Sequence, residues 1–227
     1  APDGGLFMPA SFPILTREEL EDMQNMSLTQ IAQKVSSLLF GEDIPVDALH
    51  SIVEDAINFD TPLVKVEEDL YALELFHGPT LAFKDVGARF LARLLGYFTQ
   101  DTDSEIHVLV ATSGDTGSAV ANGFLGVPGI KVHVLYPSGL VSPLQEKQFT
   151  TLGNNISAVE VQGSFDDCQN LVKEAFQDRE LRKKLTLTSA NSINLARFLP
   201  QAFYYFRAWA QLDPAKRFIF SVPSGNY

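Results

Sequence analysis

A lysine that could act as a nucleophile ends the run His77-Gly-Pro-Thr-Leu-Ala-Phe-Lys84, just before a predicted helix. Burial and the positive end of a helix both lower the pKa of a lysine, and the neutral amine can then form a Schiff base. Composition alone favours a solvent-exposed lysine at such a position. It likewise favours a structural, hydrogen-bonded role for His77 over a catalytic one.

A second candidate site is the run Thr112-Ser-Gly-Asp-Thr-Gly117, which lies between an apolar run and a predicted helix. Glycine lets the backbone approach a ligand closely, and the N–H groups of a helix N-terminus bind carboxylate or phosphate. The spacing matches neither a P-loop, which needs a lysine after the glycines, nor a dinucleotide-binding turn. An ordinary strand-to-helix turn uses the same residue types. The run alone therefore leaves both interpretations open.

Two further runs could bind an anion. The first, Ser189-Ala-Asn-Ser-Ile-Asn-Leu-Ala-Arg197, places an arginine one turn after helix-capping residues, where it could hold a phosphate. The second, Ser142-Pro-Leu-Gln-Glu-Lys147, ends on a lysine that could add positive charge. A capped helix with a solvated arginine, and a solvated lysine, explain these runs equally well.

The elements that would position these residues alternate between strand and helix from residue 61 onward. We expect strands at 64–66, 70–75, 106–111, 131–136, 158–161, 185–188 and 218–222. We expect helices at 84–98, 116–125, 143–152, 165–176 and 193–212. This alternation predicts an α/β fold, in which parallel sheets are covered by helices and loops at the carboxyl ends of the strands carry the chemistry.

The first 60 residues have a helical and acidic pattern instead. Thr16 and Ser27 each precede a Glu or Gln by three residues, which is the spacing of a capping box. They predict one helix over 17–26 and another that ends at Gly41, and a third is expected over about 46–59. We expect this helical segment to pack on a larger body.

Composition narrows the class of protein. The 227 residues carry a net charge of −11, which argues against nonspecific binding to nucleic acid or anionic membranes. Cys168 is the only cysteine, so no internal disulfide can form and a reducing compartment is favoured. No apolar run reaches the roughly 18–20 residues of a membrane span. We expect a cytoplasmic protein with a small-molecule substrate, and we assign no metal-binding residue.

Five runs resemble the threonine synthase family, in that family's order and at about its spacing. They are His77 to Asp85, Ala111 to Gly117, Ser142 to Lys147, Ser189 to Asn194, and Val222-Pro-Ser-Gly-Asn226. The run Gly5-Leu-Phe-Met-Pro9 also resembles the family's amino-terminal signature. Together these similarities extend over essentially the whole chain, so the resemblance is highly specific. It implies a fold-type II pyridoxal-phosphate enzyme with the tryptophan-synthase-β type fold.

The resemblance implies the reaction of that family, which converts O-phospho-L-homoserine and water to L-threonine and phosphate, the last step of threonine biosynthesis. In this reaction Lys84 would hold pyridoxal phosphate as a Schiff base and would act as the acid–base group. Two alternatives remain open. One is another enzyme of the same fold, such as a threonine dehydratase or a β-replacing synthase. The other is a noncatalytic phosphate- or amino-acid-binding module.

The resemblance also assigns binding residues. The substrate carboxylate would bind the loop made by Ser113, Gly114, Asp115, Thr116 and Gly117, with Asp115 beside the cofactor ring. The substrate phosphate would bind Ser192, Asn194 and Arg197, together with Lys147. The cofactor phosphate would bind Ser224, Gly225 and Asn226.

The domain division rests on the expected elements, because residues 101–179 hold three complete strand–helix units that can close a small core of their own. Residues 1–58 form the N-terminal helical segment, 59–100 and 180–227 belong to the large cofactor-binding domain, and 101–179 form a smaller α/β domain. The chain stops inside the expected loop for the cofactor phosphate. We therefore expect a fragment that lacks the C-terminal part, binds pyridoxal phosphate poorly and is inactive by itself.

Overall fold

The computed structural model describes residues 6–100, 102 and 104–222. Its helices are α1 (Arg17–Asp22), α2 (Leu28–Phe40), α3 (Val46–Ala56), α4 (Asp85–Thr99), α5 (Asp115–Phe124), α6 (Pro143–Thr150), α7 (Phe165–Gln177), α8 (Arg179–Lys184), α9 (Leu195–Phe198) and α10 (Ala202–Ala210). Short 3₁₀ turns occupy Met23–Asn25 and Leu199–Gln201. The strands are β1 (Leu63–Glu67), β2 (Leu70–Leu73), β3 (Ile106–Ala111), β4 (Ile130–Pro137), β5 (Ile156–Val161) and β6 (Thr186–Ser189).

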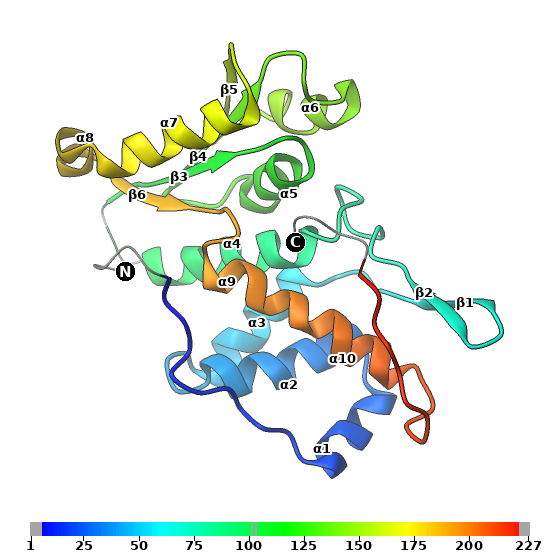
Figure 1. Cartoon of the computed structure of the whole chain (residues 1–227). Helices are drawn as coiled ribbons and strands as arrows, with labels where there is room; N and C mark the ends of the chain where they lie inside the picture. The colour runs from blue at the N-terminus through cyan, green and yellow to red at the C-terminus, as the bar shows by residue number, and fades with distance from the viewer. Residues whose placement is uncertain (1–5, 101, 103, 223–227) are drawn as a thin grey trace.

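A parallel four-stranded sheet in the order β5-β4-β3-β6 organises the part of the chain that follows α4. On one face, Val108, Val110, Val132 and Val134 pack with α4 and α5 in a dry core around Phe124. The opposite face packs against α7 through Cys168 and Val172 (Figure 1). The predicted parallel sheet covered by helices on both faces is therefore confirmed. β1 and β2 pair separately as an antiparallel hairpin.

The N-terminal helical segment is confirmed as well. Thr16 and Ser27 both close the capping boxes that the sequence predicts, and Gly41 caps the end of α2. The apolar faces of α2 and α3 bury Ile31, Leu49 and other residues in a second core, which α4 and α10 complete. This segment therefore forms the platform beneath α4.

Helix α4 joins the two cores because it is apolar on two faces. Val86 and Phe90 point into the core of the helical segment, whereas Ala88 and Leu91 point into the core beneath the sheet. Since α4 begins directly after Lys84, both cores fix the position of that lysine.

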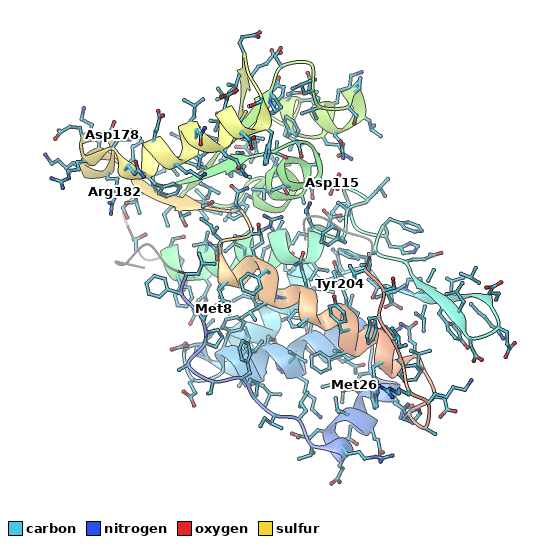
Figure 2. The ribbon with its side chains drawn as sticks, viewed as in Figure 1. Met8, Met26, Asp115, Asp178, Arg182 and Tyr204 are labelled. Atoms are coloured by element: carbon cyan, nitrogen blue, oxygen red, sulfur yellow. The ribbon has the colours of Figure 1, made fainter. Side chains whose placement is uncertain are left out.

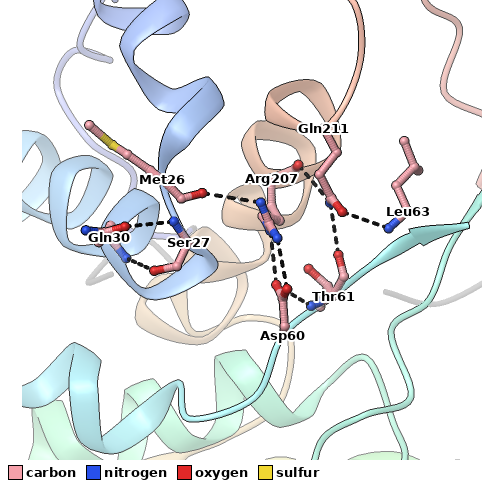
Figure 3. A network of polar contacts seen from close by, with 8 residues as sticks. All are labelled: Met26, Ser27, Gln30, Asp60, Thr61, Leu63, Arg207 and Gln211. Atoms are coloured by element: carbon pink, nitrogen blue, oxygen red, sulfur yellow. Dashed lines mark hydrogen bonds and ion pairs between the residues drawn. The ribbon is translucent and has the colours of Figure 1, made fainter.

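A polar network attaches α10 to the N-terminal part (Figure 3). Arg207 donates to both carboxylate oxygens of Asp60, at 3.0 and 2.8 Å, and to the carbonyl oxygen of Met26 at 3.2 Å. Gln211 donates to the Thr61 carbonyl and accepts from the amide of Leu63. These bonds hold α10, which lines the larger cavity described below, against the start of β1.

Three details differ from the predicted elements. Residues 218–222 form no strand, because no neighbouring strand pairs with them in the described part of the chain, and Ile219 is 91% exposed. The helix expected over 193–212 is divided at Pro200, which lies in the 3₁₀ turn between α9 and α10. Helix α8 was not among the elements expected from the sequence.

The predicted division into domains stays a prediction. β6 lies in the range assigned to the large domain, yet it pairs in parallel with β3 in the sheet assigned to the smaller one. Among the described residues, no helix is long and apolar enough to cross a membrane.

Candidate active site

Lys84 is the N-cap residue of α4 and is only 7% exposed. Burial lowers the pKa of its amine, the carboxylate of Asp115 opposes that effect, and the nearby Arg197 reinforces it. The ammonium nitrogen lies 5.0 Å from the centre of the Phe83 ring. The structure thus supports the buried lysine of lowered pKa that Schiff-base chemistry requires, rather than a solvated surface lysine.

The side chain of Asp85, the residue after Lys84, holds the loop that precedes Lys84. Asp85 is fully buried and accepts hydrogen bonds from the Thr80 amide at 2.9 Å and from the Thr80 hydroxyl at 2.5 Å. A Cβ atom at Gly78 would lie 2.4 Å from Asp85 Oδ2, so this turn needs glycine. Tyr204 of α10 donates to the Phe83 carbonyl at 2.5 Å. Contacts on both sides therefore fix the backbone that presents Lys84.

The loop between β3 and α5 is shaped from inside by Thr112. The Thr112 hydroxyl oxygen accepts from the amides of Gly114 at 2.9 Å and Gly117 at 2.8 Å. Gly114 has φ +147°, which favours glycine. The amides of Gly114 and Gly117 are thus already bonded, and neither residue lines the polar or the larger cavity described below. Direct substrate binding by these two glycines stays a prediction.

Arg197 reaches the same place from α9. Its guanidinium donates to the Ala190 carbonyl at 2.7 Å and to the Thr116 hydroxyl at 3.4 Å. The residue is 5% exposed, and burial lowers its pKa to about 10. A Cβ atom at position 87 would lie 2.1 Å from the Arg197 carbonyl oxygen, so Gly87 lets α9 approach α4. Among the described residues, no carboxylate forms an ion pair with Arg197.

These segments enclose a polar cavity of about 420 Å³ at the carboxyl end of β3. Six of the predicted site residues line it: Lys84, Ser113, Asp115, Thr116, Ser192 and Arg197. The two cations and one carboxylate among them leave a local excess of positive charge in a chain of net charge −11. The cavity is therefore suited to an anionic ligand, although the chain as a whole is acidic.

Other predicted site residues lie elsewhere. Asn194 caps α9 through the amide of Ala196, and its side chain also donates to the Ser189 carbonyl. Lys147 is exposed on α6 and lines neither cavity. Ser224, Gly225 and Asn226 lie outside the described residues.

Several residues of this cavity were not predicted from the sequence, among them Phe165 and Gln169 of α7 and the two amides Gln145 and Asn191. Gln145 lines it from α6, and Asn191 lines it while donating to the Ala111 carbonyl at 3.1 Å. Gln145 and Asn191 stand inside runs that carry the family resemblance, Ser142 to Lys147 and Ser189 to Asn194, so for these two the signal was present. Which side chain of each run points into the cavity depends on the tertiary structure.

A larger and mostly apolar cavity, of about 1040 Å³, adjoins the first one. Lys84 and Asp115 line both cavities. Asp115 of α5 and Tyr204 of α10, both labelled in Figure 2, line the larger cavity. Aromatic side chains such as Phe83 and Phe198 give it walls that suit a flat ring. An amine of lowered pKa beside an aromatic-walled space fits pyridoxal phosphate, whose aldehyde needs the amine and whose ring needs the space.

Comparison with known protein families decides the assignment. Residues 56–227 match the model of the family described as pyridoxal-phosphate dependent enzyme. The chain belongs to that family. Pyridoxal phosphate is accordingly its cofactor, and residues 1–57 match a second model, described as threonine synthase N terminus.

Individual relatives point to threonine synthases. This pyridoxal-phosphate dependent chain is 49% identical to the threonine synthase of Escherichia coli (strain K12) over 225 residues, which are 98% of this chain and 52% of that protein. It is 50% identical to the threonine synthase of Haemophilus influenzae, covering 99% of this chain and 52% of that protein. The chain spans about half the length of the curated relatives it matches.

Solved structures agree on the fold. A pyridoxal-phosphate-bound threonine synthase from Brucella melitensis superposes with a TM-score of 0.87 at 39% identity, covering 95% of this chain and 48% of that one. The Escherichia coli threonine synthase gives a TM-score of 0.85 at 48% identity, covering 94% and 49%. The predicted fold-type II architecture is confirmed by these similarities.

Proposed function

We propose that this chain contributes the lysine and the anion-binding loops of a threonine synthase, which converts O-phospho-L-homoserine and water to L-threonine and phosphate. The observation that carries the proposal is Arg197, a buried cation with no carboxylate partner among the described residues, in the cavity that also contains the Lys84 amine. Burying a charge without a partner is costly, so a dianionic substrate group is the natural ligand. The identity of about 50% to threonine synthases supports this substrate class.

The cavity offers separate places for the two anionic groups of that substrate. The hydroxyl of Ser192 and the guanidinium of Arg197 would bind the phosphate by charge-assisted hydrogen bonds. The first turn of α5 would bind the carboxylate, because the amides of Asp115 and Thr116 lie at the helix N-terminus. A substrate held at both ends places its Cα atom near Lys84 between them.

Lys84 has two roles in this proposal. Its amine anchors the cofactor, and after substrate binding the same nitrogen takes the proton from the substrate Cα and later returns it. Pyridoxal phosphate, when bound, supplies an electron sink for the electrons of the broken Cα–H bond. Burial lowers the pKa of the Lys84 amine, which favours the neutral form that can act as a base.

We also place this reaction in the cytoplasm. Cys168 is buried and free, and a chain with a single cysteine needs no oxidising compartment to fold.

The experiment that tests the proposal uses this chain completed to the length of its relatives and loaded with cofactor. Phosphate release and threonine formation are measured with O-phospho-L-homoserine, and cysteine formation with O-acetylserine plus sulfide. We expect turnover with O-phospho-L-homoserine and none with O-acetylserine plus sulfide. Turnover only with O-acetylserine would identify a β-replacing synthase, and cofactor binding without either reaction would identify a binding module; both results would contradict the proposal.

A further inference from the structure

Gln145 connects α6 to the carboxylate of Asp115. Its side-chain amide nitrogen donates a hydrogen bond to Asp115 Oδ1, and both residues line the polar cavity. This bond joins two helices that follow neighbouring strands, since α5 follows β3 and α6 follows β4. It is the contact by which α6 reaches a residue that lines both cavities.

The orientation of the Gln145 amide is set at both of its ends. Its carbonyl oxygen accepts from the hydroxyl of Ser142, the N-cap residue of α6, at 3.1 Å. Its NH₂ group then faces Asp115. The reverse orientation would place two acceptors, the amide oxygen and the carboxylate, against each other. The helix cap therefore selects the orientation that binds the carboxylate.

The backbone around Gly114 is packed against the same amide. A Cβ atom at Gly114 would lie 2.3 Å from Gln145 Oε1, and the φ of +147° also disfavours any residue but glycine there. The Ser118 hydroxyl lies within hydrogen-bonding distance of the backbone carbonyls of Gly114, at 3.2 Å, and Gln145, at 3.3 Å. These contacts leave Gln145 and the start of α5 in one fixed relation.

Asp115 and Lys84 line the same two cavities, so the carboxylate and the amine share one site. Asp115 and Arg197 are the charged groups that act on Lys84, one with a negative and one with a positive charge. Asp115 lines both of the cavities that meet at Lys84. A carboxylate free to rotate would turn toward water, where ions are better solvated, and would leave Lys84 with Arg197 alone.

We propose that Gln145 is a positioning residue, whose amide keeps the Asp115 carboxylate turned toward the Lys84 amine. The chain uses a neutral donor for this purpose, because a cation there would draw the carboxylate away from Lys84 and a second carboxylate would repel it. The inference deepens the proposed function, since it concerns the amine that anchors the cofactor in that proposal. The test of this inference needs neither cofactor nor substrate. The inference about Gln145 and the proposed function can therefore fail independently of each other.

The test measures the titration of Lys84 in the protein without cofactor. Trace acetylation with acetic anhydride is followed across a pH series by mass spectrometry of the peptide that contains Lys84. The variants are Gln145→Met, Asp115→Asn, the double variant and Gln145→Asn, whose shorter amide cannot reach Asp115. Gln148→Met is the matched control, because Gln148 lies on the same helix but donates to the Thr80 carbonyl at 3.4 Å. Far-UV circular dichroism checks that each variant is folded.

We expect Gln145→Met and Gln145→Asn to lower the apparent pKa of Lys84 by about one unit, as expected for the loss of a nearby opposite charge. Acetylation of Lys84 below that pKa then becomes about tenfold faster. Asp115→Asn should do the same, and the double variant should go no further than Asp115→Asn. The proposal is overturned if both Gln145 variants leave the Lys84 titration unchanged, if the two shifts add in the double variant, or if Gln148→Met shifts Lys84 equally.

Discussion

The guanidinium of Arg197 lies 3.4 Å from the hydroxyl of Thr116, so the helix that follows β6 meets the first turn of the helix that follows β3. β3 and β6 are neighbouring parallel strands, and their carboxyl ends lie at one edge of the sheet. Residues 81 positions apart in the chain are thereby brought to one anion-binding surface beside Lys84.

Removal of the Lys84 amine should abolish both cofactor attachment and threonine formation. Lys84→Ala leaves no nitrogen to bond the cofactor aldehyde or to take the Cα proton. The measurement is visible absorbance and phosphate release, in the chain completed to the length of its relatives. Lys184→Ala serves as the control, because Lys184 is exposed on α8 and lines neither cavity. Turnover of Lys84→Ala close to that of the control would contradict the assignment.

Removal of the buried Arg197 cation should weaken substrate binding while leaving cofactor absorbance intact. A charge-assisted hydrogen bond contributes about 1.5–3 kcal/mol, so Arg197→Ala should lose about tenfold or more in affinity for O-phospho-L-homoserine. Arg182→Ala removes an exposed cation from α8 and provides the control. Equal substrate affinity in the two variants would leave Arg197 with a structural role only.

Removal of the Thr112 hydroxyl should lower the free energy of unfolding. Thr112→Val keeps the shape of the side chain but leaves the buried amides of Gly114 and Gly117 without their acceptor. Each unsatisfied buried donor costs about 1–3 kcal/mol, so the free energy of unfolding should fall by about 2 kcal/mol or more. Urea unfolding measures the change. Thr112→Ser retains the hydroxyl oxygen and should lose much less; equal losses in the two variants would show that the hydrogen bonds contribute little.

The stacked pair His107 and His133 should make the fold sensitive to acid. Their facing ring nitrogens are 3.0 Å apart on the face of the sheet that α7 covers. Burial lowers the pKa of His133, the positive charges of His107 and Lys131 lower it further, and Glu105 opposes them. The unfolded chain, with a histidine pKa of about 6.5, then takes up the proton more readily than the folded one.

The contribution of His133 to stability is therefore present above about pH 6.5 and is lost as the pH falls below that value. Thermal unfolding of wild type and His133→Gln between pH 7.5 and 5.5 measures it. We expect the wild type to lose more stability on acidification than the variant does. His50→Gln, on α3 and away from the sheet, controls for the loss of any one imidazole. Parallel pH curves for wild type and His133→Gln would count against this explanation.

Much of the fold and part of the site could be predicted from local patterns. The capping boxes at Thr16 and Ser27 and the apolar run of β3 are short-range signals, and the structure has them where they were expected. The prediction of a strand over 218–222 was wrong. A run of apolar residues forms a strand only where a neighbouring strand can pair with its backbone N–H and C=O groups. The helix expected over 193–212 is interrupted at Pro200. Proline is a local sequence signal for such an interruption, but the prediction did not use it.

The sequence by itself determined the types and order of the residues that can take part in catalysis or binding. These are a lysine before a helix and three runs that can bind an anion. Only the tertiary structure decided which of them share a cavity. Lys84 becomes a buried amine because two cores meet on α4. Arg197 becomes a buried cation because Gly87 lets α9 approach that helix closely. Burial and charge depend on neighbours distant in the chain, and for this reason the pKa of Lys84 and the role of Gln145 could not be predicted from spacing alone.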